Sequence, residues 1–161
     1  MQIALRPLRP DDRTPLVRVV EQLSLESRLN RFFAPVQQMS DSMLEQLTNV
    51  DQRDRFAWLA VVEDDGEETP IAVARYARAG AGSSAAELGI AVADRFHGRR
   101  VGTVLLCALA LVARLNGIER FVGQVRTENG AMRALLRGLG ADLAYDEPGV
   151  LRFELPLDAV V

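Results

Sequence analysis

The sequence contains no lysine and only one cysteine and one histidine among its 161 residues. All 19 basic side chains are arginines, so the chain offers no side-chain amine for modification of itself. A single cysteine excludes an internal disulfide framework. Cys107 lies in an apolar run, where we expect a small buried hydrophobic residue. One histidine and one cysteine far apart do not make a zinc site, so we expect no metal.

The sequence also lacks strong net charge and long apolar runs. The formal net charge is −3 and the pI about 5.3, whereas nucleic-acid-binding domains are typically basic, so we expect no nucleic-acid partner. The longest apolar stretch, Val104–Ala113, is too short to span a bilayer. The first residues form no apolar run of signal-peptide length. We therefore expect a cytoplasmic protein with no membrane partner.

The residues present are typical of one globular domain, which we expect to span residues 1–161. Hydrophobic residues make up 48% and charged residues 25%, an ordinary globular composition. Strand and helix patterns alternate, which predicts an α/β fold. The expected strands are Ile3–Leu8, Phe56–Glu63, Pro70–Arg78, Ala86–Ala93, Ile118–Arg126, Leu143–Tyr145 and Val150–Leu155. Helices are expected to start near Asp12, Ser24, Ser40, Arg100 and Thr127 or Glu128.

The helix expected from Arg100 to Asn116 has apolar residues on nearly every face. A helix of this kind is usually buried. We therefore expect it to pack against the sheet and to be covered on its outer side as well.

The segment His97–Thr103 carries the strongest chemical signal, because it joins a strand to this long helix. A helix N-terminus offers free N–H groups and partial positive charge, and a glycine lets a phosphate approach the backbone. Arg99 and Arg100 add charge for a pyrophosphate or a 3′-phosphate, and Thr103 adds a hydroxyl. By this argument alone the segment is either a phosphate-binding loop or a plain turn with solvated arginines.

Two familiar nucleotide-binding loops are excluded. A Walker loop needs a lysine, which the chain lacks. The dinucleotide fingerprint needs three spaced glycines, and only Gly98 and Gly102 are present.

This segment resembles the cofactor loop of the GNAT family of acyl-CoA-dependent N-acetyltransferases, which reads Arg/Gln-x-x-Gly-x-Gly/Ala. His97 stands where Arg or Gln is usual. Arg100 stands where the first Gly is usual, and there it either crowds the pyrophosphate or points outward. Asn129, followed by Ala131, matches the family's Asn-x-x-Ala segment, where the Asn lies near the pantetheine arm.

The resemblance implies a GNAT-like domain with a mixed, mostly antiparallel twisted sheet flanked by helices. It also implies acetyl-CoA as cosubstrate, with backbone groups of the strand after the base pairing with the pantetheine. The cofactor-binding residues that it implies are Ile90, Ala91, Val92, His97, Gly98, Arg99, Arg100, Val101, Gly102, Thr103 and Asn129.

Three further segments are similar to the bacterial protein lysine acetyltransferase (Pat) branch of this family. They are Leu23–Phe33, Leu47–Asp51 and Ile71–Tyr76. The resemblance implies a protein lysine as acceptor and Glu87 as general base. The alternative for Glu87 is a solvent-facing glutamate at a strand edge. Leu136 occupies the position where many family members carry the tyrosine that protonates the leaving thiolate.

Other interpretations remain open at this point. Arg28, Arg31, Phe32 and Phe33 either shape the acceptor entrance or belong to an ordinary amphipathic helix. The acceptor is either a protein lysine or a small amine. A non-catalytic acyl-CoA-binding regulatory module and a structural partner subunit are further alternatives. A homodimer that uses the apolar run Leu155–Val161 is one hypothesis for the assembly.

Overall fold

The computed structural model describes residues 2–160, so Met1 and Val161, the ends of the expected domain, lie outside the described residues. The predicted alternation of strands and helices is confirmed, with boundaries shifted by a few residues at most. The elements are β1 Ile3–Pro7, α1 Arg13–Glu21, α2 Leu25–Phe32, α3 Asp41–Thr48, β2 Arg55–Asp64, β3 Glu67–Arg78, β4 Ala85–Val92, α4 Val101–Leu115, β5 Arg120–Arg126, α5 Gly130–Gly138, β6 Asp142–Glu147 and β7 Val150–Pro156. Short 3₁₀ turns, η1 and η2, cover Asp94–Phe96 and Leu157–Ala159.

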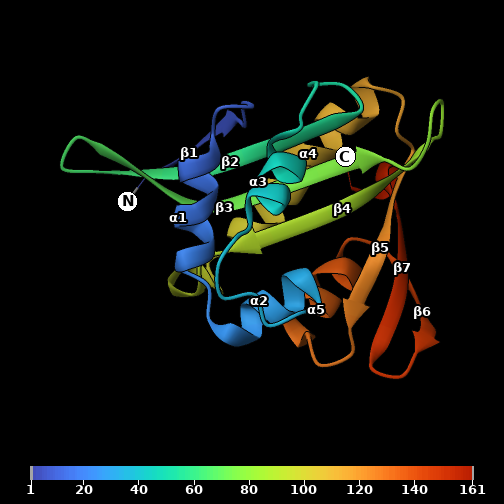
Figure 1. Cartoon of the computed structure of the whole chain (residues 1–161). Helices are drawn as coiled ribbons and strands as arrows, with labels where there is room; N and C mark the ends of the chain where they lie inside the picture. Colours follow the sequence, from blue (N-terminus) through green and yellow to red (C-terminus); the bar gives the residue numbers. More distant parts are fainter. Residues whose placement is uncertain (1, 161) are drawn as a thin grey trace.

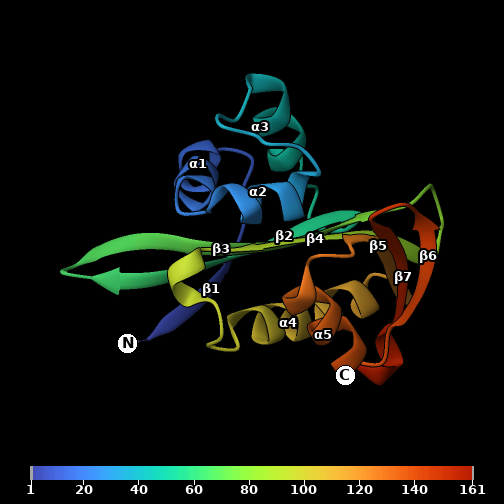
Figure 2. The same cartoon turned by 90° about the horizontal axis from the view of Figure 1, so that it is seen from below.

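The described strands form one sheet in the order β1-β2-β3-β4-β5-β7-β6 (Figure 1). Neighbouring strands are antiparallel except β4 and β5, which are parallel. The expected mixed, mostly antiparallel sheet is therefore confirmed. Helices α1, α2 and α3 cover one face and α4 and α5 the other (Figure 2).

Strand β2 shows why the sheet needs helices on both faces. Phe56 and Ala60 belong to the core beneath α4, whereas Ala57 and Leu59 belong to the core shared with α1 and α3. Alternate residues of a strand point to opposite faces, so a run that is apolar throughout must be buried on both sides.

Helix α4 packs only its inner side against the sheet. Leu105 and Leu109 are fully buried, but Val104, Leu111 and Leu115 are 56%, 55% and 86% exposed. The expected outer cover is therefore wrong for residues 2–160, because the helical layer here is one helix thick (Figure 2). Cys107, also on α4, is partly exposed rather than fully buried. No helix of residues 2–160 is both long enough and apolar enough to cross a membrane.

The apolar C-terminal run is largely used inside the chain. Leu155 and Leu157 are fully buried in the core, and Val161 lies outside the described residues. The large side chains on which a dimer interface at Leu155–Val161 would depend are therefore already packed against this chain's own sheet and helices.

Strands β4 and β5 pair along only part of their length. Their register joins Ala85 to Arg120, Ala86 to Phe121 and Glu87 to Val122. Beyond Glu87, β4 continues along β3 and β5 continues along β7. The two central strands therefore separate, which opens the middle of the sheet.

Candidate active site

A groove of about 900 Å³ lies where β4 and β5 separate. It collects residues from β4, the loop before α4, β5, the start of α5 and the end of α2. The sequence-predicted residues that line it are Glu87, Ile90, Ala91, Val92, His97, Gly98, Arg100, Val101, Gly102, Thr103 and Asn129. A volume of this size suits a cofactor-sized ligand. Their roles in binding remain predictions.

Arg99 is the predicted residue that the groove lining does not include. Its guanidinium carbon lies 5.3 Å from the centre of the Phe96 ring, and Arg95 lies 4.7 Å from the same ring. Phe96 itself is buried. Both arginines are therefore within cation–π distance of the Phe96 ring, and a contact between Arg99 and a phosphate remains a prediction.

The exposed side of β4 offers backbone groups to the groove. Ala93 N–H donates to Ile71 O over 2.8 Å, so the odd-numbered residues here pair with β3. Because strand residues alternate in the side to which their backbone groups point, Leu88, Ile90 and Val92 direct theirs towards the groove. Of the three predicted pantetheine-pairing residues, Ile90 and Val92 therefore have suitable backbone geometry, and Ala91 pairs with β3.

The side chain of His97 already forms a hydrogen bond with one of these backbone groups. Its Nε2 lies 2.8 Å from the Val92 carbonyl oxygen, so Nε2 carries the proton and donates it to this bond. The contact ties the loop before α4 to the end of β4. His97 thereby limits how far along β4 a ligand can pair.

The loop before α4 requires left-handed backbone at two positions. Gly98 has φ 74° and Arg100, the N-cap of α4, has φ 64°. An L side chain is disfavoured in this conformation by about 1–2 kcal/mol, which explains a preference for glycine at the position of Arg100. The Arg100 side chain is exposed and lines the groove.

The first turn of α4 presents free donors to the groove. The Val104 N–H donates to Arg100 O over 3.1 Å, so the amides of Val101, Gly102 and Thr103 precede the intrahelical bonds. Together with the helix dipole, they suit a phosphate group. The helix that follows is 15 residues long, long enough to carry a full dipole.

Asn129 caps α5. Its Oδ1 accepts a hydrogen bond of 3.2 Å from the Met132 N–H, as residues of this type commonly do at a helix start. Its side chain also lines the groove, so capping and a ligand contact are compatible.

Glu87 sits at the point where the groove begins. It is exposed and belongs to the last residue pair that joins β4 to β5. In β3 it faces Ala77, a small residue that leaves the carboxylate accessible. A carboxylate in this position can accept a proton from a group that enters the groove.

No tyrosine lines the groove within residues 2–160. Tyr76 is buried, with its hydroxyl donating to Arg53 O over 2.7 Å, and Tyr145 lies exposed on β6. Leu136 is fully buried in the core. In the same part of the chain, no cluster of three His, Cys, Asp or Glu residues could hold a metal ion.

Two strand glycines line the groove and were missed from the sequence. A Cβ at Gly89 would lie 2.7 Å from Arg31 Nη2, and a Cβ at Gly123 would lie 2.7 Å from Phe153 Cε2. An isolated glycine within a strand pattern commonly marks close approach of another group. That signal could have indicated that side chains are packed against the backbone at these two positions.

The residues of α2 and its C-cap are expected either to shape the acceptor entrance or to have only a structural role, and the structure separates them. Arg31, Phe32 and Phe33 line the groove. Arg28 instead donates to the carbonyls of Leu23, Val36 and Gln37 over 2.8–3.2 Å, which fixes the loop after α2. Arg28 is therefore structural, whereas the other three residues lie where an acceptor could enter.

Comparison with known proteins places the fold and the groove in one family. Residues 2–142 match the model of the acetyltransferase (GNAT) domain. The chain is 36% identical over 160 residues to the acetyltransferase Pat of Mycolicibacterium smegmatis, of which it spans 47% of the length. It is 33% identical over 138 residues to an acetyltransferase of Pseudomonas aeruginosa, where the match covers 86% of this chain and 74% of the relative.

Solved structures agree with the sequence comparisons. The GNAT domain of S. lividans PAT superposes with a TM-score of 0.85 at 34% identity, covering 94% of this chain and 89% of that one. The PaiA N-acetyltransferase from Thermoplasma acidophilum, solved with coenzyme A, shares the fold with a TM-score of 0.73 at 17% identity, covering 97% and 99%. The chain therefore belongs to the GNAT acetyltransferase family and is related to the Pat acetyltransferases.

Proposed function

We propose that the chain transfers the acetyl group of acetyl-CoA directly to a protein lysine amine, with Glu87 as general base. The observation that carries the proposal is the position of Glu87 at the vertex of the groove, where β4 and β5 separate. The name of the M. smegmatis relative supports the acetyl group, and the coenzyme A complex of PaiA supports the cofactor class. The similarity to the Pat branch supports the lysine acceptor.

The residues present suit acetyl-CoA. The free amides of Val101, Gly102 and Thr103 at the start of α4 would bind the pyrophosphate. The N–H and C=O of Ile90 would pair with the pantetheine amides as a further strand would. This arrangement directs the thioester end of the cofactor towards Glu87, and positioning of this kind supplies a large part of the rate enhancement.

The reaction needs two proton transfers, one from the attacking amine and one to the leaving thiolate. The neutral amine attacks the thioester carbonyl carbon, the new C–N bond forms and the C–S bond breaks. Glu87 accepts the proton of the attacking amine, directly or through a water. The leaving thiolate takes a proton from solvent, since no tyrosine of residues 2–160 lines the groove. Backbone N–H groups of β4 stabilise the negative charge that develops on the carbonyl oxygen.

Titration of the protein with acetyl-CoA, with free CoA as control, tests the cofactor step first. Transfer to lysine-bearing proteins is then measured by mass spectrometry for the wild type and Glu87→Gln. We expect Glu87→Gln to lower turnover by about 10²- to 10⁴-fold and to leave cofactor affinity unchanged. Glu63→Gln, an exposed glutamate at the end of β2, serves as the matched control and should keep full activity.

Each contrary result points to one alternative. Cofactor binding without turnover on any amine would support a regulatory acyl-CoA-binding module. Turnover on small amines but not on proteins would support a small-molecule acetyltransferase. No binding at millimolar acetyl-CoA would leave a partner subunit that retains only the fold.

A further inference from the structure

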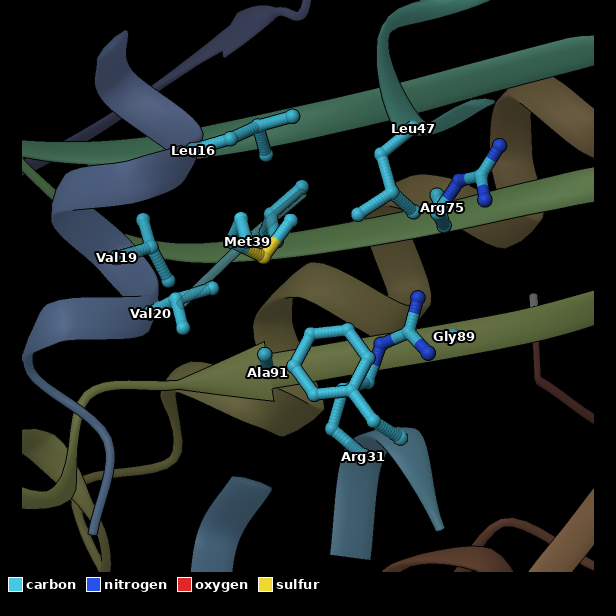
Figure 3. Close-up of a pocket in the computed structure, with 11 residues that line it drawn as sticks. Leu16, Val19, Val20, Arg31, Met39, Leu47, Arg75, Gly89 and Ala91 are labelled. Carbon is cyan, nitrogen blue, oxygen red and sulfur yellow. The ribbon is translucent and has the colours of Figure 1, made fainter. Parts of the chain in front are cut away.

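Two arginines lie on the sheet face covered by α1, α2 and α3. Arg31 comes from α2 and Arg75 from β3, and Arg75 pairs in register with Gly89 of β4. Both line a small cavity of about 20 Å³ whose other walls include the apolar side chains of Leu16 and Val20. Figure 3 shows both side chains over β3 and β4, with the Arg31 guanidinium beside Gly89.

Neither arginine forms an ion pair in residues 2–160, although the Glu87 carboxylate acts on Arg75 from beyond ion-pair distance. Elsewhere on the sheet, Arg6 is paired with Asp12 at 2.8 Å and Arg78 with Asp54 at 2.8 Å. Within residues 2–160, no carboxylate oxygen lies within 4.0 Å of the Arg31 or Arg75 guanidinium. The buried Nε of Arg75 also has no hydrogen-bond partner there.

The two side chains keep their charge despite this environment. Burial, together with the neighbouring charge of Arg75, lowers the pKa of Arg31 to about 10. Burial and the charge of Arg55 lower the pKa of Arg75, and the Glu87 carboxylate opposes this only in part. At neutral pH Arg31 is therefore still protonated, and the positive charge of Arg75 is near enough to act on it. Arg31 is half-buried and has no ion pair within residues 2–160, so an anion that reaches it would gain a charge-assisted contact.

The strand is built to admit the Arg31 head group. A Cβ at Gly89 would lie 2.7 Å from Arg31 Nη2, so any other residue there would displace the guanidinium. Glycine weakens a strand interior, and here it lets a cation lie against the backbone. Glu87 is two residues away on β4 and therefore on the same face.

The anion must approach from the groove. The small cavity has room for about one water molecule, which is too little for a carboxylate. Arg31 lines the groove as well as the cavity, so its guanidinium can be reached from the side on which Glu87 lies. Arg75 lines the cavity but not the groove, so it adds positive charge near the site without contacting the anion.

We infer that Arg31, supported by Arg75, binds a carboxylate that the acceptor carries beside its reacting amine. Arginine and a carboxylate form paired, charge-assisted hydrogen bonds, and the short distance along β4 would place the amine near Glu87. The carboxylate comes either from an acidic side chain next to a lysine in a protein or from a small amino acid. The inference rests on the proposed function for the identity of the amine site.

Binding of a simple probe tests the anion site without catalysis. The CoA-loaded protein is titrated by calorimetry with glutarate and with glutaramide, its uncharged counterpart. We expect glutarate to bind at least tenfold more tightly to the wild type. Arg31→Gln should abolish the difference and Arg75→Gln should reduce it. Arg137→Gln, an exposed arginine on α5, is the matched control and should retain it. Equal affinity of the wild type for both probes would overturn the inference, even if the variants fail to fold.

Acceptor pairs then distinguish the source of the carboxylate. Peptides with a lysine next to Asp or next to Asn are compared, as are 4-aminobutyrate and 4-aminobutanamide. A tenfold higher kcat/KM for the acidic member of the peptide pair supports a protein acceptor, and the same preference only in the small pair supports an amino acid. Transfer without any acidic preference would overturn the inference. Glutarate binding without transfer to any amine would refute the proposed function and leave the anion site in place.

Discussion

Arg100 offers a test in which backbone strain and side-chain charge can be separated. The residue has φ 64° and is exposed. Arg100→Ala removes the charge but keeps an L side chain in the left-handed region, whereas Arg100→Gly removes both. The comparison of these two variants with each other, rather than with the wild type, isolates the backbone contribution.

The expected difference in stability is modest and measurable. Left-handed backbone costs a residue other than glycine about 1–2 kcal/mol, and glycine gives back about 0.4–1 kcal/mol through the greater freedom of the unfolded chain. Arg100→Gly should therefore be about 1 kcal/mol more stable than Arg100→Ala, or about 2–4 °C in Tm for a chain of this size. Thermal unfolding without ligand measures it.

Gly98→Ala provides a control in the same loop. Gly98 has φ 74°, and a Cβ there would meet no atom within 4 Å, so only the backbone term changes and we expect a loss of about 1 kcal/mol. If Arg100→Gly is no more stable than Arg100→Ala, the assignment of strain to this position is wrong.

Cofactor affinity of the same variants decides whether Arg100 contacts phosphate, crowds the pyrophosphate or points outward. If the guanidinium contacts phosphate, both variants should bind acetyl-CoA more weakly, by up to about fivefold for an exposed ion pair. If it crowds the pyrophosphate, both should bind more tightly than the wild type, and if it points outward, their affinity should be unchanged. Calorimetric titration distinguishes these results.

Two further predictions concern stability. Asn129→Ala removes the acceptor for the Met132 N–H and should cost about 1 kcal/mol, and an unchanged Tm would show that the cap contributes nothing. Hydrogen bonds from Arg6 lower the pKa of Asp12 below its ordinary value. Its stabilising contribution is therefore present above pH about 4 and lost as the pH falls further. Acid unfolding of Asp12→Asn should lack this component, and identical acid profiles would contradict it.

Much of the fold could be predicted because each element has a local signal. The uninterrupted apolar run within β2 indicates burial by itself. The helical spacing of Leu105 and Leu109 does the same for α4. The loop before α4 was found in the same way, because its glycines and arginines are adjacent in sequence. The Asn129 cap was also recognisable from residue type and position.

The remaining features depend on contacts between distant segments. Arg31 and Arg75 are 44 positions apart in the sequence, and no local pattern shows that Gly89 brings them together. The direction of Arg99 towards Phe96 depends on the backbone rotation at the loop. Likewise, the exposure of Leu115 depends on which elements the fold places over α4, and periodicity carries no information on that.

The short pairing of β4 with β5 also has a dynamic consequence. Within residues 2–160, three residue pairs connect β1–β4 with β5–β7–β6, so the two parts of the sheet are joined along a short seam between β4 and β5. Movement of one part of the sheet relative to the other should appear as faster amide hydrogen exchange in β4 and β5, beside the seam, than in the outer strands. A ligand bound across the seam would slow exchange in β4 and β5 together. The exchange rate of these two strands would therefore report the fraction of protein that has ligand bound.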